Sequence, residues 1–253
     1  MIQLSSSQKK VLEIYHNEGH IKAWNYWKLV GNTYGIFLGE VPSNNFIDGD
    51  SLAKHIGLTK GVFCNVDAPW LKFILDGNII YVAKKPIMYS VSWEHIYQAG
   101  AVYGTNDNGS NPSGANRIQD ANINVDGFSL DVTLLRGANT VPTGTDFTGY
   151  DLAFTHSSEW NRLMYPIHSG IHTTTSNPST PSVPYARWAS YSDGDLLVHR
   201  DFGNGSLSWT QETPATSTQR LLRGFPGITN VNRFTATFTG TVIGWRPCLR
   251  LAQ

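Results

Sequence analysis

Cysteine is almost absent from this chain of 253 residues, which contains only Cys64 and Cys248. Two cysteines at no motif spacing exclude a cysteine zinc site, and they argue against a disulfide scaffold. We therefore expect two buried free thiols. The sequence also lacks a phosphate-binding loop and a dinucleotide-binding fingerprint, so we expect no cofactor.

Charge is scarce and balanced, with 19 basic and 19 acidic side chains that make up 15% of the chain. Without a basic excess, no global field draws the protein onto nucleic acid or an anionic membrane. The sequence has no apolar run of about eighteen residues, which a membrane span needs, and its start does not resemble a signal peptide. We expect a soluble protein that neither binds nucleic acid nor inserts into a membrane.

Aromatic residues and turn-forming residues are abundant by contrast. Aromatics make up 12% of the chain, which also holds 24 glycines and 12 prolines. This balance is typical of proteins built from strands and turns with long polar loops. The length allows one large core or two small ones.

Two segments have the pattern of β-hairpins. Trp70–Lys85 contains two runs of β-branched and aromatic residues on either side of Asp76-Gly77. Residues 123–137 alternate apolar and polar side chains around Asp126-Gly127. Asp-Gly between two such runs predicts a tight hairpin turn in each segment.

Four short helices are predicted from apolar spacing and capping residues. They are the stretches 7–15, 50–57 capped by Asp50, 92–100 capped by Ser92, and 159–165 ended by Pro166. Such caps accept hydrogen bonds from the first free N–H groups of a helix, and proline cannot continue one. Two polar stretches, 104–119 and 173–184, are predicted to be exposed loops. Helices and strands together predict a β-rich α+β fold.

The last strand is predicted at Thr241–Leu251, where Trp245 and Arg246 lie between apolar positions and precede Pro247. A flat indole and a rigid guanidinium suit a strand end fixed in a core. We expect both to be structural anchors. The same role is expected of Trp70, Trp93 and Trp160.

Patterns with metal-ligand spacing have simpler explanations here. Two histidine pairs are four residues apart: His16 and His20, and His168 and His172. Glycine or proline interrupts a helix at each pair, so neither pair shares a helical face. A calcium loop starting at Asn122 would need glutamate at its twelfth position, where the chain has Thr133. We expect no metal site.

The candidate ligand-binding residues lie in the C-terminal third, where aromatic and polar side chains occur in predicted loops. They are Trp188, Tyr191, Asp193, Asp195, Asn204 and Trp209. Aromatic rings cover the apolar faces of sugars, while carboxylates and amides bind sugar hydroxyls. The alternative is that the tryptophans belong to the core and that Asp193-Gly194-Asp195 is a turn between strands.

Hydrolysis requires two carboxylates, or a Ser-His-Asp set, in one cleft. The acidic residues available are Glu159, Glu212, Asp193, Asp195 and Asp201, and no spacing selects a pair. Glu159 has a simpler role in the first turn of a helix, where the dipole favours an acid. We therefore expect that the protein is not an enzyme.

The order of several motifs resembles virion structural proteins of tailed bacteriophages. These motifs are the hairpin at Trp70–Lys85, then S-W-E-H-I, G-A-V-Y-G, L-L-R-G, S-E-W-N-R-L-M-Y, S-W-T-Q-E and G-W-R-P-C-L-R-L. The resemblance covers about Trp70 to Leu251. The closing part is similar to the C-type-lectin-like fold of the formylglycine-generating-enzyme type. Enzymes of that type use paired cysteines that this chain lacks, so the resemblance implies fold and virion context only.

The resemblance implies a β-rich domain at 70–253 with a lectin-like C-terminal part. Residues 1–69 are then an N-terminal docking segment, or they add strands to the same domain. The implied role is that of a tail, collar or head-surface protein, made in the host cytoplasm and assembled into the virion as a homo-oligomer with other virion proteins. Its possible ligand is a host surface glycan. The alternative function is a lectin or glycan-active enzyme that recognises host cell-surface polysaccharide.

Overall fold

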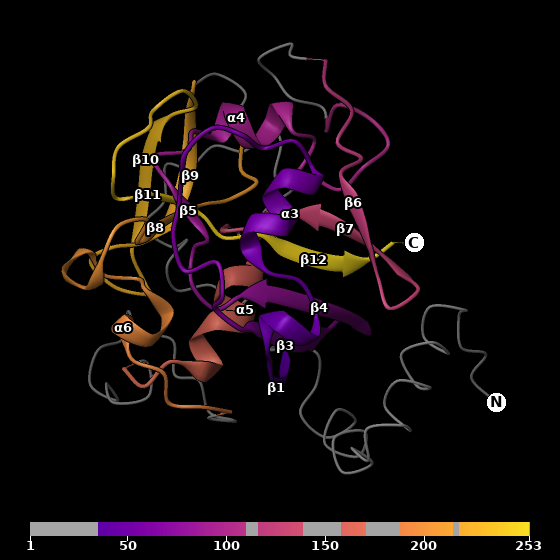
Figure 1. Ribbon diagram of the computed structural model, residues 1–253. Helices are drawn as coiled ribbons and strands as arrows, with labels where there is room; N and C mark the ends of the chain where they lie inside the picture. Colours follow the sequence, from indigo (N-terminus) through magenta and orange to yellow (C-terminus); the bar gives the residue numbers. More distant parts are fainter. Residues whose placement is uncertain (1–34, 110–115, 139–157, 171–187, 215–217, 253) are drawn as a thin grey trace.

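The computed structural model describes residues 35–109, 116–138, 158–170, 188–214 and 218–252. These residues form two six-stranded sheets with short helices packed around them, which confirms the predicted β-rich fold (Figure 1). The lectin-like character of the C-terminal part stays a prediction. None of the helices among the described residues is long and apolar enough to cross a membrane.

The first sheet is antiparallel throughout and combines strands from both ends of the described chain. Its order is β1 (Ile36–Val41), β3 (Trp70–Leu75), β4 (Asn78–Ala83), β12 (Cys248–Leu251), β7 (Phe128–Thr133) and β6 (Asn122–Val125). Figure 1 shows it from the β6–β7 hairpin above to β1 below. The last strand of the chain therefore lies at the centre of the sheet.

The second sheet lies beside the first, at the upper left of Figure 1. Its order is β10 (Val231–Thr235), β9 (Gln219–Gly224), β8 (Leu207–Trp209), β11 (Ile243–Trp245), β5 (Met88–Tyr89) and β2 (Val62–Phe63). Only the pairing of β8 with β11 is parallel among these strands.

Both predicted hairpins are confirmed. β3 pairs with β4 and β6 pairs with β7 through two-residue turns. Asp76 has φ 51° and Gly77 φ 79°, while Asp126 has φ 50° and Gly127 φ 82°. Two successive positive φ values define the turn that matches the twist of paired strands, and Asp-Gly tolerates them.

The helices in the described part of the chain are all short. The α-helices are α3 (Gly49–His55), α4 (Trp93–Gln98), α5 (Glu159–Met164) and α6 (Asp193–Leu196), and the 3-10 helices are η1 (Ser43–Asn45), η3 (Tyr165–Ile167) and η4 (Arg200–Phe202). Ser92 caps α4 as predicted, and Ser158 caps α5. The predicted helix at 7–15 and the predicted loop at 173–184 lie outside the described residues.

Two local predictions were wrong, because in each case a side chain caps a helix at a position that we did not expect from the sequence. Asp48, not Asp50, caps α3 by accepting a hydrogen bond from the Ser51 N–H at 2.8 Å. The expected turn at Asp193–Asp195 is the helix α6, in which Ser192 and Asp195 exchange capping hydrogen bonds. This reciprocal box satisfies two free N–H groups and supports a single helical turn.

The terminal segment is not one strand. β11 ends at Trp245 in the second sheet, and β12 begins at Cys248 in the first. Arg246 and Pro247 carry the chain from one sheet to the other. Proline has no N–H to donate to a ladder, so it suits the break between the two strands.

Residues 35–69 contribute to both sheets. β1 pairs with β3 in the first sheet, and β2 pairs with β5 in the second. These pairings cross position 69, so residues 35–69 share both sheets with the residues that follow them. Residues 1–34 lie outside the described part.

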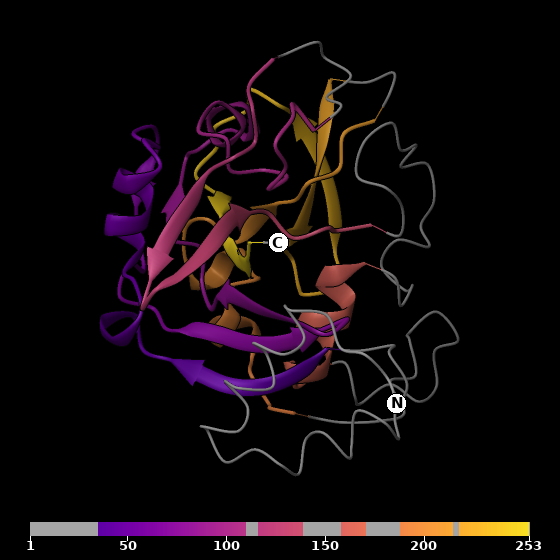
Figure 2. The same ribbon diagram turned by 90° about the vertical axis from the view of Figure 1, so that its right-hand side faces the viewer.

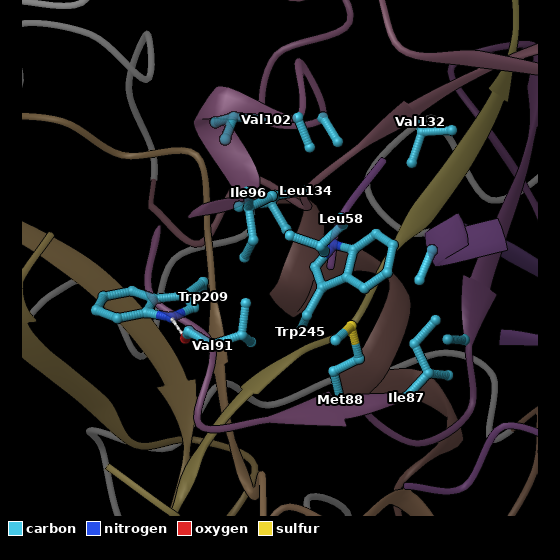
Figure 3. Close-up of a cluster of buried hydrophobic side chains, with 14 of the residues drawn as sticks. Leu58, Ile87, Met88, Val91, Ile96, Val102, Val132, Leu134, Trp209 and Trp245 are labelled. Carbon is cyan, nitrogen blue, oxygen red and sulfur yellow. Dashed lines mark hydrogen bonds between the residues drawn. The ribbon is translucent and has the colours of Figure 1, made fainter. Parts of the chain in front are cut away.

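The main core lies between the sheets and draws large side chains from both. Figure 3 shows Trp245 beside Leu58, Ile87 and Met88, with Trp209 donating its indole N–H to the Val91 carbonyl. The predicted anchors Trp70, Trp93, Trp160 and Trp245 are each at most 1% exposed. A second cluster, which includes Cys248, fills the space between α5 and the first sheet. Figure 2 shows α5 at the end of that sheet.

The cysteines are both free. Cys248 is fully buried as expected, and Cys64 is half-buried, so the second expectation is only partly met. Burial raises the pKa of each thiol to about 11. Neither is a thiolate at neutral pH, and thiolate is the reactive form.

Arg246 joins three parts of the fold from a position that is 1% exposed. Its Nε donates to Ser208 Oγ of β8 at 3.2 Å, and Nη1 donates to the carbonyl oxygens of Ala83 and Lys84 at 3.0 and 2.5 Å. Its Nη2 donates to the Leu196 carbonyl of α6 at 2.5 Å. Burial lowers the pKa of Arg246 to about 9, so it remains protonated at neutral pH.

Replacing the Arg246 guanidinium should destabilise the fold. We expect Arg246→Lys to lower the free energy of unfolding by about 3 kcal/mol, because one ammonium cannot reach acceptors in both sheets and α6. Arg200→Lys is the matched control, since its side chain is 66% exposed. Urea denaturation measures both, and equal midpoints would contradict the anchoring role.

Candidate functional site

The six residues proposed as ligand contacts do not form one site. Trp209 is 1% exposed and belongs to the main core, so its ring has no ligand-facing surface. Asn204 lies in an exposed turn before β8. The other four lie together in residues 188–195, next to the β1 edge of the first sheet.

Tyr191 connects this segment to the sheet. Its hydroxyl donates to Glu40 Oε1 at 2.5 Å, and Lys84 Nζ donates to the same oxygen at 2.7 Å. The Lys84 ammonium also lies 4.4 Å from the centre of the Tyr191 ring. Phe37 meets that ring edge-on, and Trp188 packs against the same cluster. These contacts fix the segment to the sheet.

The two aspartates are also engaged internally. Asp193 Oδ1 lies 3.0 Å from His168 Nε2, and Asp195 completes the capping box with Ser192. His168 Nδ1 accepts from the Gly170 N–H, which leaves Nε2 as the protonated nitrogen that donates to Asp193. The polar groups predicted to bind sugar therefore serve to hold α6 and its neighbours in place.

A polar cavity of about 590 Å³ opens on the first sheet, on the face that α5 covers. Its lining comes from both hairpins, α5, the end of β12 and the loops near 105 and 120. The polar side chains are Asp76, Asn78, Thr105, Asn106, Gln119, Asp120, Asn122, Ser129, Asp131, Arg136, Glu159 and Arg250. None of the described residues in the lining is aromatic.

The register of three strands places the floor of this cavity. Arg250 of β12 is directly opposite Ile80 of β4 and Asp131 of β7, and Asp131 is opposite Asn122 of β6. Directly opposite residues point to the same face of a sheet. The four side chains therefore line one continuous floor, although they come from distant parts of the sequence.

Glu159, at the start of α5, closes the inner wall. Its side chain is 5% exposed, and its two oxygens accept from Arg250 Nη1 and Nη2 at 3.0 and 2.6 Å. The Arg136 N–H donates to Oε2 at 2.9 Å, and Arg136 Nε lies 3.3 Å from Oε1. Arg250 Nε donates to Thr133 Oγ1 at 3.0 Å. This network fixes both guanidinium groups in the wall.

The charge state of Glu159 follows from these contacts. Burial alone would raise its pKa, but Arg250 and Arg136 outweigh burial and hold the pKa of Glu159 below its ordinary value. Asp76, at the rim, is paired with Arg162 of α5 through hydrogen bonds of 2.7 and 2.6 Å. Two of the cavity's carboxylates are therefore already paired.

Asp131 differs from these two carboxylates. Among the described residues, its carboxylate makes no hydrogen bond and no ion pair. It interacts with Arg250 only through longer-range electrostatics. Burial raises the pKa of Asp131, and nearby Arg250 only partly opposes that rise. An acceptor that is partly desolvated and has no partner is available to a ligand.

Glu159 is engaged on both of its oxygens. Oε1 accepts from Arg250 and also lies 3.3 Å from Arg136 Nε, while Oε2 accepts from Arg250 and from the Arg136 N–H. Glu212 and Asp201, two other acids considered for hydrolysis, are outside the lining. The described residues contain no group of three or more histidine, cysteine or acidic side chains that could hold a metal ion.

Few features of the sequence indicate this cavity. Ser129, Asp131 and Thr133 are polar residues alternating with apolar ones, which predicts a polar face on the second hairpin. Nothing in the sequence indicates that Arg250 and Glu159 meet that face, because the pairing depends on β12 entering the middle of the sheet. Glu159 was expected only to stabilise the helix start.

A smaller cavity of about 270 Å³ lies on the other face of the first sheet. It is lined mainly by apolar and aromatic side chains, including Phe46, Tyr81 and Phe128. Lys72, also in the lining, lies 5.8 Å from the centre of the Tyr81 ring. Its few polar groups give it less capacity for specific recognition than the polar cavity.

The role of Glu159 can be tested against that of Glu94, which also lies in the first turn of its helix, α4. We expect Glu159→Gln to lower the free energy of unfolding by about 3 kcal/mol or more, since it leaves two arginines without their carboxylate. Glu94→Gln should cost about 0.5 kcal/mol, the size of a helix-dipole effect.

The same variant should change the response to acid. Because the folded-state pKa of Glu159 is lowered, its stabilisation is present above the ordinary value of 4.5 and is lost as the pH falls through the lower folded value. Wild-type protein should therefore lose its advantage over Glu159→Gln on acidification, as measured by urea denaturation. Equal losses for the two glutamate variants at neutral pH would show that only the helix dipole matters.

Comparison of the chain with protein-family models, curated proteins and solved structures finds no match.

Proposed function

We propose that the chain is a recognition protein that binds a carbohydrate in the polar cavity without cleaving it. The observation that carries the proposal is the composition of the lining, in which amide, hydroxyl, carboxylate and guanidinium groups surround about 590 Å³. Sugars present many hydroxyl groups that both donate and accept hydrogen bonds, and this lining offers partners of both kinds.

The rigidity of the wall supports binding. Arg250 and Arg136 are fixed by Glu159, and Asp76 is fixed by Arg162, before any ligand arrives. Polar groups held in place lose less conformational entropy on binding than mobile ones do. The cavity is therefore organised in advance for a polar ligand.

The setting that we propose is the surface of a tailed-phage particle, as a tail, collar or head-surface protein. The support is the sequence resemblance between about Trp70 and Leu251. In that setting the ligand is a glycan of the host cell surface, and symmetric repetition of the chain would multiply weak single-site binding.

A glycan array with purified protein tests carbohydrate binding. We expect selective binding that Ser129→Trp abolishes, because an indole at this lining position fills the cavity. Lys54→Trp, at an exposed position on α3, is the control that should bind like wild type. Loss of binding on Trp188→Ala instead would assign the site to residues 188–195. Release of reducing sugar would refute the claim that the protein does not cleave its ligand.

The proposed setting has its own test. Mass spectrometry of purified phage particles encoding this chain should detect it at a copy number typical of a structural protein. Labelled antibodies should then bind intact particles at a tail, collar or head position. Absence of the chain from purified particles would refute the virion assignment and leave carbohydrate binding to be judged by the array.

A further inference from the structure

The charges in the polar cavity are not balanced locally. Four carboxylates line it, from Asp76, Asp120, Asp131 and Glu159, against the guanidinium groups of Arg136 and Arg250. Both guanidinium groups contact Glu159. The two cations of the lining are therefore directed at one acid in the inner wall.

The remaining acids differ in how well they are paired. Asp76 has two short hydrogen bonds from Arg162, which is outside the lining. Asp120 has only an exposed arginine, Arg117, at 3.8 Å. Asp131 has no hydrogen bond or ion pair with the described residues. Negative charge without close compensation is thus concentrated at Asp131 and, more weakly, at Asp120.

These two acids belong to the same side of the cavity. Asp131 is directly opposite Asn122 in the β6–β7 ladder, and Asp120 precedes Asn122 by two residues. Asn122 Nδ2 donates to the backbone carbonyl of Asp120, which leaves its side-chain oxygen available as a further acceptor. This side of the cavity therefore presents acceptors, whereas the guanidinium donors of Arg250 and Arg136 are directed at Glu159.

Among the described residues, the lining carries no aromatic ring on which an apolar sugar face could stack. The polar and charged side chains of the lining therefore supply the specificity. A charged hydrogen bond to a partly desolvated carboxylate is the strongest such contact that the cavity offers.

From this arrangement we infer that the ligand places a protonated amine against Asp131, which makes it an amino sugar with a free ammonium group. The inference rests on the proposed carbohydrate-binding function and names its substrate class. The ammonium group donates to the Asp131 carboxylate and the Asn122 side-chain oxygen, and the ring hydroxyls accept from Arg136 beside Glu159.

Three oligosaccharides of one length and linkage test the inference, because they differ only at carbon 2 of each ring. Chitosan tetrasaccharide carries amines, its N-acetylated form carries acetamides, and cellotetraose carries hydroxyls. Isothermal titration calorimetry in one slightly acidic buffer, in which the amine is protonated, should show the amine form binding roughly tenfold more tightly than the others.

The isosteric variant Asp131→Asn should lose this preference, since it removes the charge and keeps the shape. Asp126→Asn is the matched control, because Asp126 is in the turn of the same hairpin and outside the lining, and its positive φ tolerates asparagine. The control should keep the tenfold preference. Thermal unfolding of both variants at the wild-type temperature would show that the fold is intact.

The outcomes separate this inference from the function on which it rests. Equal binding of the three oligosaccharides, no binding of the amine form, or a preference that survives in Asp131→Asn would overturn the inference. A neutral glycan selected on the array and blocked by Ser129→Trp would then leave the proposed function standing. An array without any selective ligand would overturn the proposed function itself.

Discussion

The buried guanidinium of Arg246 is the constraint on which the two-sheet arrangement depends. It lies where the chain leaves the second sheet and enters the first, and it donates to Ser208 of β8, to carbonyl oxygens at the end of β4 and to Leu196 of α6. Among the described residues it has no carboxylate partner, so its charge is satisfied by a hydroxyl group, carbonyl dipoles and the nearby Trp160 ring. Such a buried charge is tolerated only when its donors are matched in direction, and that requirement fixes the relative placement of all three elements.

That placement also produces the polar cavity. Because the chain crosses at Arg246 and Pro247, β12 enters the first sheet between β4 and β7. Arg250 thereby reaches the face of the sheet that α5 covers, where it meets Glu159. A core interaction and a surface site thus share one short segment: its first residues join the sheets, and its later residues supply the cation that organises the cavity wall.

Two carboxylates at helix starts illustrate how local rules and tertiary contacts combine. Glu94 and Glu159 occupy the first turns of α4 and α5, where the helix dipole favours an acid. Glu94 accepts one exposed hydrogen bond from Gln98. Glu159 is buried and holds two arginines. The sequence predicted that Glu159 lies in the first turn of a helix, but only the tertiary structure distinguishes its role from that of Glu94, because the arginines lie 23 and 91 residues away along the chain.

The sequence by itself determined the features that depend on neighbouring residues: the Asp-Gly hairpin turns, the helix beginning after Ser92, the helix ended near Pro166 and the β-rich character. The sequence did not predict the caps at Asp48 and Ser192, where short helices begin without a long apolar pattern. The tertiary structure decided the partners of distant residues. It buried Trp209, engaged Tyr191 with Glu40, split the terminal strand between two sheets and placed Asp131 beside Arg250. Strand order and register bring such residues together, and neither is encoded within any local window of sequence.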